Sequence, residues 1–568
     1  MKNKTFFKIP IKWTYKYFGN IGEQLVEKLN LDRKIKYAAI NISPQGYGAI
    51  LSFYILISLL LEISTAIISL IVVKNILPLL ILTPIILSIP IILTIYPQIK
   101  ANIRKKHLSI EFPFITIYIG LMSLVGISPY KSFERLANQE ILKAAKEEAK
   151  LIIKEKTFFT KEPTLALESI AKNHPLKEFQ KYILNYISIS KTGGNAVKYL
   201  IEYGSKVTEL MRNTIKKYAE DAKLYGDLMI TLFVFAPLGI FSIMSILAVN
   251  QGIIFMKIYS YLLSPIIALA LILAINSDQP KFQQETINYL KLPIKILSIS
   301  IPIVIALKFI KIPFLIQLNS YELISIVILS SLIPSAIAYE EYVRECSKIE
   351  EYLPNFLRDI AEARRIGLSI EKILHEISNK NYGKLTKIIR QIEKLTKYTL
   401  TPIDKAIEQT IKQLKSWISK VILWLFKEAI IAGGGNPETF ELLAKFTEDY
   451  LEVKRKISRE LKSYYIIGYI ASIMLLIIML QIINFGLLTQ TQIAENTPSN
   501  INLNIKLPSK EELNELMNTC FNSIIIISSL IGLIMGKISS GNIAGGFKHS
   551  IICTLISLVG IKGVKILW

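Results

Sequence analysis

The segment EYLPNFLRDIAEARRIGLSIEKIL, from Glu351 to Leu374, decides the fold of this chain. Pro354 is expected to begin a helix, because the fixed φ of proline suits the first helical turn. Apolar side chains recur along this helix at spacings of three and four: Leu353, Phe356, Leu357 and Ile360. Gly367 predicts a left-handed helix end, and Ser369 predicts the cap of the next helix. The segment is therefore expected to be a corner between two water-soluble helices.

The chain around this corner is too apolar for an ordinary soluble protein. Of its 568 residues, 51% are hydrophobic and only 20% are charged, and the mean hydropathy is +0.42. The three cysteines and four histidines are scattered, so we expect no disulfide framework, no metal site and no cofactor. The formal charge of +23 fits nucleic acid, anionic lipid or an acidic partner. In a membrane protein, however, lysine and arginine first of all collect on the cytoplasmic side.

Apolar stretches of about 20 residues predict nine membrane spans. They cover residues 48–73, 76–96, 228–249, 253–275, 292–310, 321–338, 464–487, 521–537 and 549–567. Two long polar segments, 97–226 and 339–463, hold 22 and 23 lysines and arginines, so the positive-inside rule places both in the cytoplasm. The N-terminus then lies inside, and an odd number of spans puts the C-terminus outside.

The sequence thus predicts an all-α integral membrane protein of the cell membrane, with about nine transmembrane helices and two repeated cytoplasmic helical bundles. Six parts follow: a cytoplasmic amphipathic N-terminal tail (1–46), a transmembrane helix pair (47–96), a first cytoplasmic helical domain (97–226), four transmembrane helices (227–338), a second cytoplasmic helical domain (339–463), and transmembrane helices with an outer loop at 488–520 (464–568). The tail is amphipathic and is expected to lie on the lipid surface of the membrane.

The two cytoplasmic domains are copies of one unit, which we call the first copy and the second copy. A constant offset of 241 residues relates Pro113 to Pro354, Gly126 to Gly367, Ser128 to Ser369 and Gly194 to Gly435. Each copy is preceded by two spans, so the whole arrangement is a duplication. In both copies we expect the proline to begin a helix, the first glycine to end it and the serine to cap the next helix.

The helix that follows Pro113 differs from its counterpart, because it is apolar nearly all round. Its apolar positions include Ile117, Tyr118, Leu121 and Leu124. We favour a helix buried inside its own bundle; the alternative is a contact in a dimer or between domains. A tenth span is rejected, because roughly 20 residues are needed and only about 13 separate Pro113 from Gly126.

A resemblance to a known family rests on LPNFLRDIAE, Leu353–Glu362, followed by GLS, Gly367–Ser369. This run resembles the signature of the type II secretion F-domain family, the membrane platform proteins of type II secretion and type IV pilus machines. Members carry the F domain twice, as here. The chain length, the extra membrane helices and the tail ending NISP at Pro44 resemble the archaeal branch, which serves archaella and adhesion pili. In the first copy the match rests on Pro113, Gly126 and Ser128.

The resemblance implies a platform protein without catalytic activity. Such a protein binds a cytoplasmic hexameric ATPase through its soluble domains, and it couples ATP-driven movement to the extraction of pilin or archaellin subunits from the bilayer. A homodimer is expected, because a two-fold object fits under a six-fold ATPase. No nucleic acid is expected, because the basic residues are spread over the loops instead of being gathered on one face.

The charged side of the helix at 353–365 is the candidate docking surface for the ATPase. Its members are Arg358, Asp359, Glu362, Arg364 and Arg365. The alternative is a solvated face held by local pairs such as Arg358 with Glu362, four residues apart.

Three further features have a functional and a structural interpretation. Glu62 lies near the middle of the first predicted span, where an ionisable group points to function by default, although a protonated or internally paired structural role is favoured. A basic cluster before the seventh span is expected to anchor the span on the cytoplasmic side: Lys454, Arg455, Lys456 and Arg459. The run Gly433–Gly435 lacks the order of a phosphate-binding loop and is expected to break a helix.

Two rival classes are weaker. An aspartyl membrane peptidase needs two aspartates at membrane depth, and the predicted spans contain none there. The alternative function is a multi-pass transporter with cytoplasmic regulatory domains. Transporter repeats lie mostly in the membrane, whereas the best-matched part of this repeat is soluble.

Overall fold

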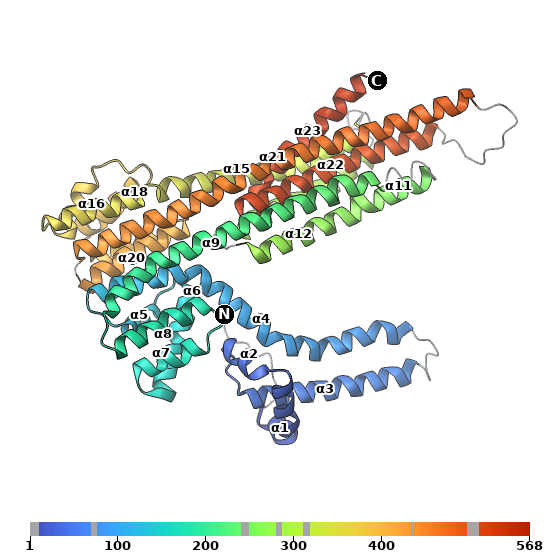
Figure 1. Ribbon diagram of the computed structural model, residues 1–568. Coiled ribbons are helices and arrows are strands. Elements are labelled where there is room, and N and C mark those ends of the chain that lie inside the picture. The colour runs from blue at the N-terminus through green and yellow to red at the C-terminus, as the bar shows by residue number, and fades with distance from the viewer. Residues whose placement is uncertain are drawn as a thin grey trace. The chain divides into compact units, whose positions relative to one another are not determined.

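Figure 1 shows the computed structural model, which describes residues 11–69, 77–239, 249–279, 287–309, 318–433, 435–496 and 510–567. Over these residues the regular structure is helical throughout, as predicted. The contacts divide the chain into two compact units, Met1–Val207 and Thr208–Trp568. Their boundary lies inside the helix α9, so the first copy contributes residues to both units. Each unit is described by itself.

The first unit starts with a helical tail and a pair of long helices. Its helices are α1 (Ile11–Lys28), α2 (Leu31–Tyr37), α3 (Pro44–Ile67), α4 (Leu77–Leu124), α5 (Pro129–Leu136), α6 (Lys143–Glu155), the π-helical turn η2 (Lys156–Thr160), α7 (Pro163–Lys172), α8 (Lys177–Lys191) and the start of α9 (Ala196–Ile230). Ser43 caps α3 by accepting a hydrogen bond from the backbone of Gly46 at 3.1 Å. The predicted tail therefore folds as two helices before α3 begins.

The tail packs on α3 through glycine. A Cβ atom on Gly22 would lie 2.5 Å from the backbone nitrogen of Ala49, so the two helix backbones touch. Nearer the start of α1, the ring of Trp13 meets Phe53 edge-on at 5.6 Å. The outer side of α1 exposes Tyr15 and Tyr17. This helix thus exposes aromatic side chains beside the first candidate span, and such rings are typical of a membrane surface.

The second unit combines long helices with the second copy. Its helices are the rest of α9, the π-helical turn η3 (Thr231–Phe235), α11 (Val249–Ile258), η4 (Tyr259–Leu263), α12 (Ser264–Asp278), α13 (Ile287–Phe309), α15 (Ser320–Glu350), α16 (Leu353–Arg365), α17 (Ile370–Ile377), α18 (Leu385–Lys397), α19 (Ile403–Gln413), α20 (Trp417–Gly433), α21 (Pro437–Asn496), α22 (Lys510–Ser540), the 3-10 turn η5 (Ile543–Gly545) and α23 (Gly546–Leu567). The helices α16 to α20 gather at one end of this unit (Figure 1).

Eight helical stretches in the described residues are long and apolar enough to cross a membrane. They are Pro44–Ile67, Leu82–Leu124, Ala196–Gly239, Gly252–Asp278, Ser320–Arg365, Pro437–Gln481, Asn514–Ser540 and Ile543–Val564. Each contains or overlaps one of the predicted spans. The remaining prediction, 292–310, falls on α13, apart from its last residue, which lies outside the described residues. The predicted outer loop at 488–520 likewise lies partly outside them, at 497–509.

One expected helix start is wrong. The helix α4 runs unbroken through Pro113 to Leu124, so Pro113 lies inside it. A proline inside a helix removes one backbone hydrogen bond and favours a bend, but a buried helix tolerates it when packing holds the chain. In the second copy the prediction is right, because two turn residues follow α15 and Pro354 then lies in the first turn of α16.

The two copies repeat the same order of helices. The matched pairs are α5 with α17, α6 with α18, α7 with α19, α8 with α20 and α9 with α21. The first copy ends its long helix at Leu124 and the second at Arg365, which preserves the offset of 241 residues. The repeat predicted from a few prolines and glycines therefore extends over five helices.

Two ion pairs fix the direction of the last helix in the second unit. Lys548 at the start of α23 lies 3.0 Å from Glu340 on α15, and Lys562 near its end lies 3.2 Å from Glu322 at the start of α15. The two helices are therefore antiparallel, and α23 ends at the opposite end of α15 from the second copy. A basic residue near the C-terminus thus has an acidic partner, so it does not argue for a cytoplasmic end.

The helices α22 and α23 form a close hairpin through small residues. A Cβ atom on Gly536 would lie 1.9 Å from Cα of Gly546, and one on Gly532 would lie 2.4 Å from Cα of Ser550. Between the helices, the hydroxyl of Ser550 lies 2.8 Å from the hydroxyl of Ser529. Small residues spaced four apart let helix backbones approach within a membrane, so this hairpin is a tightly packed part of the second unit.

Candidate functional site

The corner between α16 and α17 has the geometry that its sequence predicts. Gly367 is left-handed, with φ of 89°. The backbone nitrogen of Gly367 donates to the carbonyl of Arg364 at 3.0 Å, and that of Leu368 donates to Ala363 at 3.3 Å. This pair of bonds satisfies the free carbonyls at the end of α16. Ser369 then accepts a hydrogen bond from the backbone of Lys372 at 3.4 Å and so caps α17.

The matching corner of the first copy is built in the same way. Gly126 has φ of 79°, and the backbone of Ile127 donates to Met122 at 2.9 Å. Ser128 caps α5 through the backbone of Lys131 at 3.4 Å. The glycine helix end and the serine cap are therefore present in both copies.

The second glycine of the motif is only partly matched. In the second copy Gly435 is left-handed, with φ of 73°, whereas in the first copy the left-handed residue is Gly193, not Gly194. The corner before α9 is thus shifted by one residue relative to the corner before α21. Both corners break a helix, as predicted for the glycine runs.

The apolar face of α16 forms part of the core of the second copy. Its buried members are Leu353, Phe356, Leu357 and Ile360. The ring of Phe356 meets Phe426 on α20 at 5.6 Å, and Phe426 meets Phe440 on α21 at 5.4 Å. The predicted stripe is therefore correct, and it fixes which side of α16 faces outward.

On the outward side, two arginines pair with α21. Arg358 lies 2.7 Å from Glu448, and Arg365 lies 2.6 Å from Glu441. The local pair of Arg358 with Glu362, given as an example of the alternative solvated face, is wrong: the partner of Arg358 is 90 residues away along the chain. The reason is that α21 packs antiparallel along α16 and presents a glutamate opposite each arginine. All four side chains in the two pairs are about half exposed.

The other three charged residues of α16 have different roles. Arg364 donates to the carbonyl of Gly435 at 2.9 Å and to that of Leu368 at 2.8 Å, so it joins two corners of the bundle. Asp359 accepts hydrogen bonds from Lys380 at 2.9 Å and from the hydroxyl of Tyr382. Glu362 is exposed, and the described residues offer it no ion pair within 4 Å. The predicted docking face is thus mostly paired within the second copy.

Comparison with known proteins bears on the same residues. The model of the family "Type II secretion system (T2SS), protein F" matches residues 356–483, which begin in α16 and end in α21. Residues 356–483 form a type II secretion F domain. An uncharacterized protein of Methanocaldococcus jannaschii is 23% identical over 506 residues, which is 82% of each chain. No solved structure matches the chain.

The first copy contains a buried ionic cluster that sequence reasoning missed. Arg104 on α4 holds Glu148 on α6 through two hydrogen bonds of 2.6 Å. Its third contact is the carbonyl of Tyr37 in the tail, at 2.8 Å. The ring of His174 lies 3.5 Å from the same carboxylate. The cluster therefore ties the tail, α4, α6 and the α7–α8 loop together.

The electrostatics of this cluster favour a charged Glu148 paired with Arg104. Burial alone would raise the pKa of Glu148, but the Arg104 guanidinium outweighs it and holds that pKa at about 2. Burial lowers the pKa of His174 below its ordinary value. A signal in the sequence was available: Glu148 lies on the apolar face of α6 with Ala145 and Ile152. A carboxylate on such a face needs a cation.

The apolar helix of the first copy is buried, as favoured. Its buried residues include Ile117, Tyr118 and Leu121. Neighbouring α8 and α9 cover part of it: Phe112 meets Phe179 at 6.3 Å and Tyr203 at 6.3 Å. At the positions that match the charged residues Arg358, Asp359 and Glu362 of α16, the first copy thus has buried apolar residues: Ile117, Tyr118 and Leu121.

Glu62 lies close to the end of α3, not at its middle, because α3 already begins at Pro44. Its Oε2 atom is buried and has no hydrogen-bond partner among the described residues. Neither the functional nor the structural interpretation is tested by this geometry.

The basic cluster before the seventh span has one member with a clear structural partner. Lys454 lies 2.6 Å from Glu350, a buried carboxylate at the end of α15. Glu350 also accepts a hydrogen bond from Ser416 at 2.7 Å. The other members, Arg455, Lys456 and Arg459, are exposed on α21. In the described residues, no group of three acidic, histidine or cysteine side chains is arranged to hold a metal.

Proposed function

We propose that this protein is the non-catalytic membrane platform of an archaeal filament machine of the archaellum or adhesion-pilus type. It couples a cytoplasmic hexameric ATPase to the extraction of pilin or archaellin subunits from the cell membrane and to filament assembly. The single observation that carries this proposal is the F domain at 356–483, a family whose members are platform proteins. Long helices connect this domain directly to the predicted membrane spans.

The mechanical argument rests on α21. This helix contains 60 residues, from Pro437 to Asn496, and it runs from the α20–α21 corner of the second copy into the predicted span at 464–487. At 1.5 Å per residue, a helix of this length extends about 90 Å. A push on the second copy is therefore transmitted along one rigid element instead of being lost in a linker.

The second copy is the proposed docking domain, with the N-terminus of the chain and both copies in the cytoplasm. Arg358 and Arg365 are half exposed on its surface, and their pairs with Glu448 and Glu441 are of the weak, solvated kind. In such a pair the arginine can readily leave its own glutamate and bind a carboxylate of a partner protein instead. A homodimer in the membrane presents two such domains to the ATPase.

The test is binding of the purified secretion-type ATPase of the same organism to the full-length protein in lipid nanodiscs. Wild-type protein is expected to bind. The reversals Arg358→Glu and Arg365→Glu together are expected to weaken binding at least tenfold, because they place four carboxylates on that face.

A matched variant separates docking from folding. Adding Glu448→Arg and Glu441→Arg restores both internal ion pairs with the charges exchanged between α16 and α21. If the arginines of α16 contact the ATPase, binding stays weak in this fourfold variant, whereas recovered binding shows that the internal pairs alone mattered. Absence of binding by the wild-type protein contradicts the platform function.

A further inference from the structure

The order of its helices and two contacts identify a near end and a far end of the second copy. The near end is marked by Gly383, packed against the ring of Tyr352 just after α15. It is also marked by Lys415, 2.7 Å from Glu345 on α15. The corners α17–α18 and α19–α20 are therefore near the long helices. In a bundle of alternating helices, the corners α16–α17, α18–α19 and α20–α21 then lie at the opposite end.

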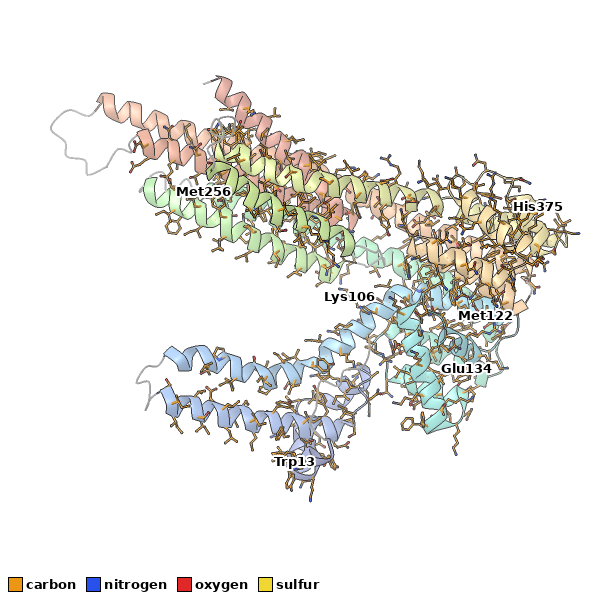
Figure 2. All side chains as sticks on the ribbon, turned by 180° about the vertical axis from the view of Figure 1, so that it is seen from behind. Trp13, Lys106, Met122, Glu134, Met256 and His375 are labelled. Atoms are coloured by element: carbon orange, nitrogen blue, oxygen red, sulfur yellow. The ribbon has the colours of Figure 1, made fainter. Side chains whose placement is uncertain are left out.

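The pictures agree with this assignment. His375, on α17, lies at the end of the second unit opposite Met256, on α11 (Figure 2). Its imidazole Nδ1 is 2.6 Å from Glu393 on α18, so these two helices are side by side in this part of the bundle. The end of α18 at Lys397 is one turn further along. The α18–α19 corner thus belongs to the far end.

Three apolar side chains project from two of these far corners, and we call them the end face: Ile366, Tyr398 and Leu400. They are 79%, 74% and 84% exposed, the highest values for large apolar side chains in the described part of the chain. Ile366 directly follows Arg364 and Arg365, so the end face adjoins the charged side of α16. An apolar centre with a charged border is the usual anatomy of a protein interface.

Neither the backbone conformation nor the packing at position 400 favours a leucine. Its backbone is left-handed, with φ of 48°, a conformation that suits glycine or asparagine and is unfavourable for a branched apolar residue. At 84% exposure its side chain gives almost nothing to the core. The side chain of Leu400 therefore does not stabilise the fold.

Neither lipid nor a second copy of the chain fits the end face. On α21, Lys462 lies 25 residues after Pro437, just before the apolar stretch, and this is about 38 Å of helix at 1.5 Å per residue. The bilayer that holds the spans is therefore out of reach. Copies in one membrane are related by an axis along its normal, so their end faces point the same way and do not oppose one another. A soluble protein remains.

The border of the end face indicates the chemistry of that protein. Lys394, Lys397 and Lys405 flank the α18–α19 corner and are exposed. The ammonium of Lys397 lies 5.8 Å from the centre of the Tyr398 ring. Cations around an apolar centre complement a hydrophobic pocket that is rimmed by carboxylates.

We infer that the end face inserts into an apolar, acid-rimmed pocket on the cytoplasmic ATPase, and that it is the centre of the docking contact. This inference rests on the proposed function and adds the surface at which the two proteins meet. The arginines of α16 then belong to the border of the contact, while the three apolar side chains form its core.

The experiment compares three full-length proteins in nanodiscs for binding of the purified ATPase. The test variant is Ile366→Gln with Tyr398→Ser and Leu400→Asn; asparagine accepts the left-handed backbone, so folding is preserved. The matched control is Phe158→Ser with Phe159→Ser, which removes two apolar side chains of 73% and 71% exposure from the first copy. Equal thermal midpoints for the three proteins establish equal folding.

The expected result is at least tenfold weaker binding by the test variant and less than twofold change in the control. Wild-type binding that the test variant retains overturns the inference and leaves the proposed function standing. An equal loss in both variants also overturns it, since any exposed apolar side chain would then suffice. If the wild-type protein does not bind, the proposed function fails, and this inference fails with it.

Discussion

Replacing Gly536 by alanine is expected to force α22 and α23 apart. The added Cβ atom would lie 1.9 Å from Cα and 2.3 Å from the backbone nitrogen of Gly546. Non-bonded carbon atoms stay about 3.5–4.0 Å apart. Because both clashing atoms belong to backbone, no side chain can turn away to make room, and the two helices have to separate by about 1.5–2 Å.

The cost of that separation can be worked out from the contacts it disturbs. Overpacking of a close-packed contact costs about 1–3 kcal/mol. The hydroxyl of Ser550 bonds both the hydroxyl and the carbonyl of Ser529 at 2.8 Å, and that of Ser557 bonds Ser528 at 2.7 Å. Hydrogen bonds between membrane helices are worth about 0.6 kcal/mol each. Gly536→Ala is therefore expected to lower the free energy of unfolding by about 3–5 kcal/mol.

The chain carries its own probes for the measurement. All three cysteines are buried, and Cys520 and Cys553 lie on α22 and α23. A maleimide dye that fluoresces on reaction with a thiol reports their exposure as the detergent-solubilised protein is heated. Gly536→Ala is expected to lower the midpoint by several degrees. Gly563→Ala is the control, since its Cβ atom meets nothing within 4 Å. Equal midpoints for the two variants would refute the close contact.

Three further predictions concern the two copies. Glu148→Gln leaves Arg104 buried without its anion and is expected to cost about 3–5 kcal/mol, measured by thermal unfolding at pH 7. Lowering the pH acts in the same direction. The stabilisation of the fold by the Glu148 carboxylate is complete above pH 4.5, its ordinary pKa, and is lost as the pH falls towards about 2. Because the fold also lowers the pKa of His174, protonation of this residue in the unfolded chain starts to reduce stability near pH 6.5. The midpoint of Glu148→Gln should therefore depend less on acid than that of the wild type. Gly367→Ala is expected to lose about 1–2 kcal/mol through its left-handed backbone, whereas Gly204→Ala, inside α9, should be neutral or stabilising in the same assay. Arg459→Pro, but not Arg459→Ala, should kink α21; under the proposed function it keeps ATPase binding and abolishes filament assembly, and assembly by the proline variant would contradict the role of α21 as a rigid link.

The elements that the sequence predicted well are those whose chemistry is local. Gly367 and Ser369 specify a corner through their own backbone and side chain, and both are found as expected. Apolar periodicity identifies the buried side of α16 for the same reason, because residues three and four apart share a face wherever the helix lies. The offset of 241 residues carried the same inferences from one copy to the other.

The features that were missed depend on partners far along the chain. Glu448 lies 90 residues from Arg358, and no rule of helix spacing connects them. The partner of Glu148 is 44 residues away on α4. Gly532 and Gly536 do show the spacing of a close helix contact in the sequence, but the sequence does not say which helix they meet. Pro113 shows the converse, since tertiary packing allowed a helix to continue where local preference predicts a start.

Under the proposed function, force applied to the end face reaches the membrane through the packing of α16 on α21. Arg358 and Arg365 are seven residues apart, and their partners Glu448 and Glu441 are seven residues apart in the opposite direction. Each exposed pair is weak, so together they set the register of α16 on α21 more than they add stability. The strong connection is the aromatic core of Phe356, Phe426 and Phe440. Under the proposed function, a load on Ile366 is carried through this core into α21, which continues as one helix from Pro437 to Asn496 into the predicted span, so the second copy and its span are expected to move together.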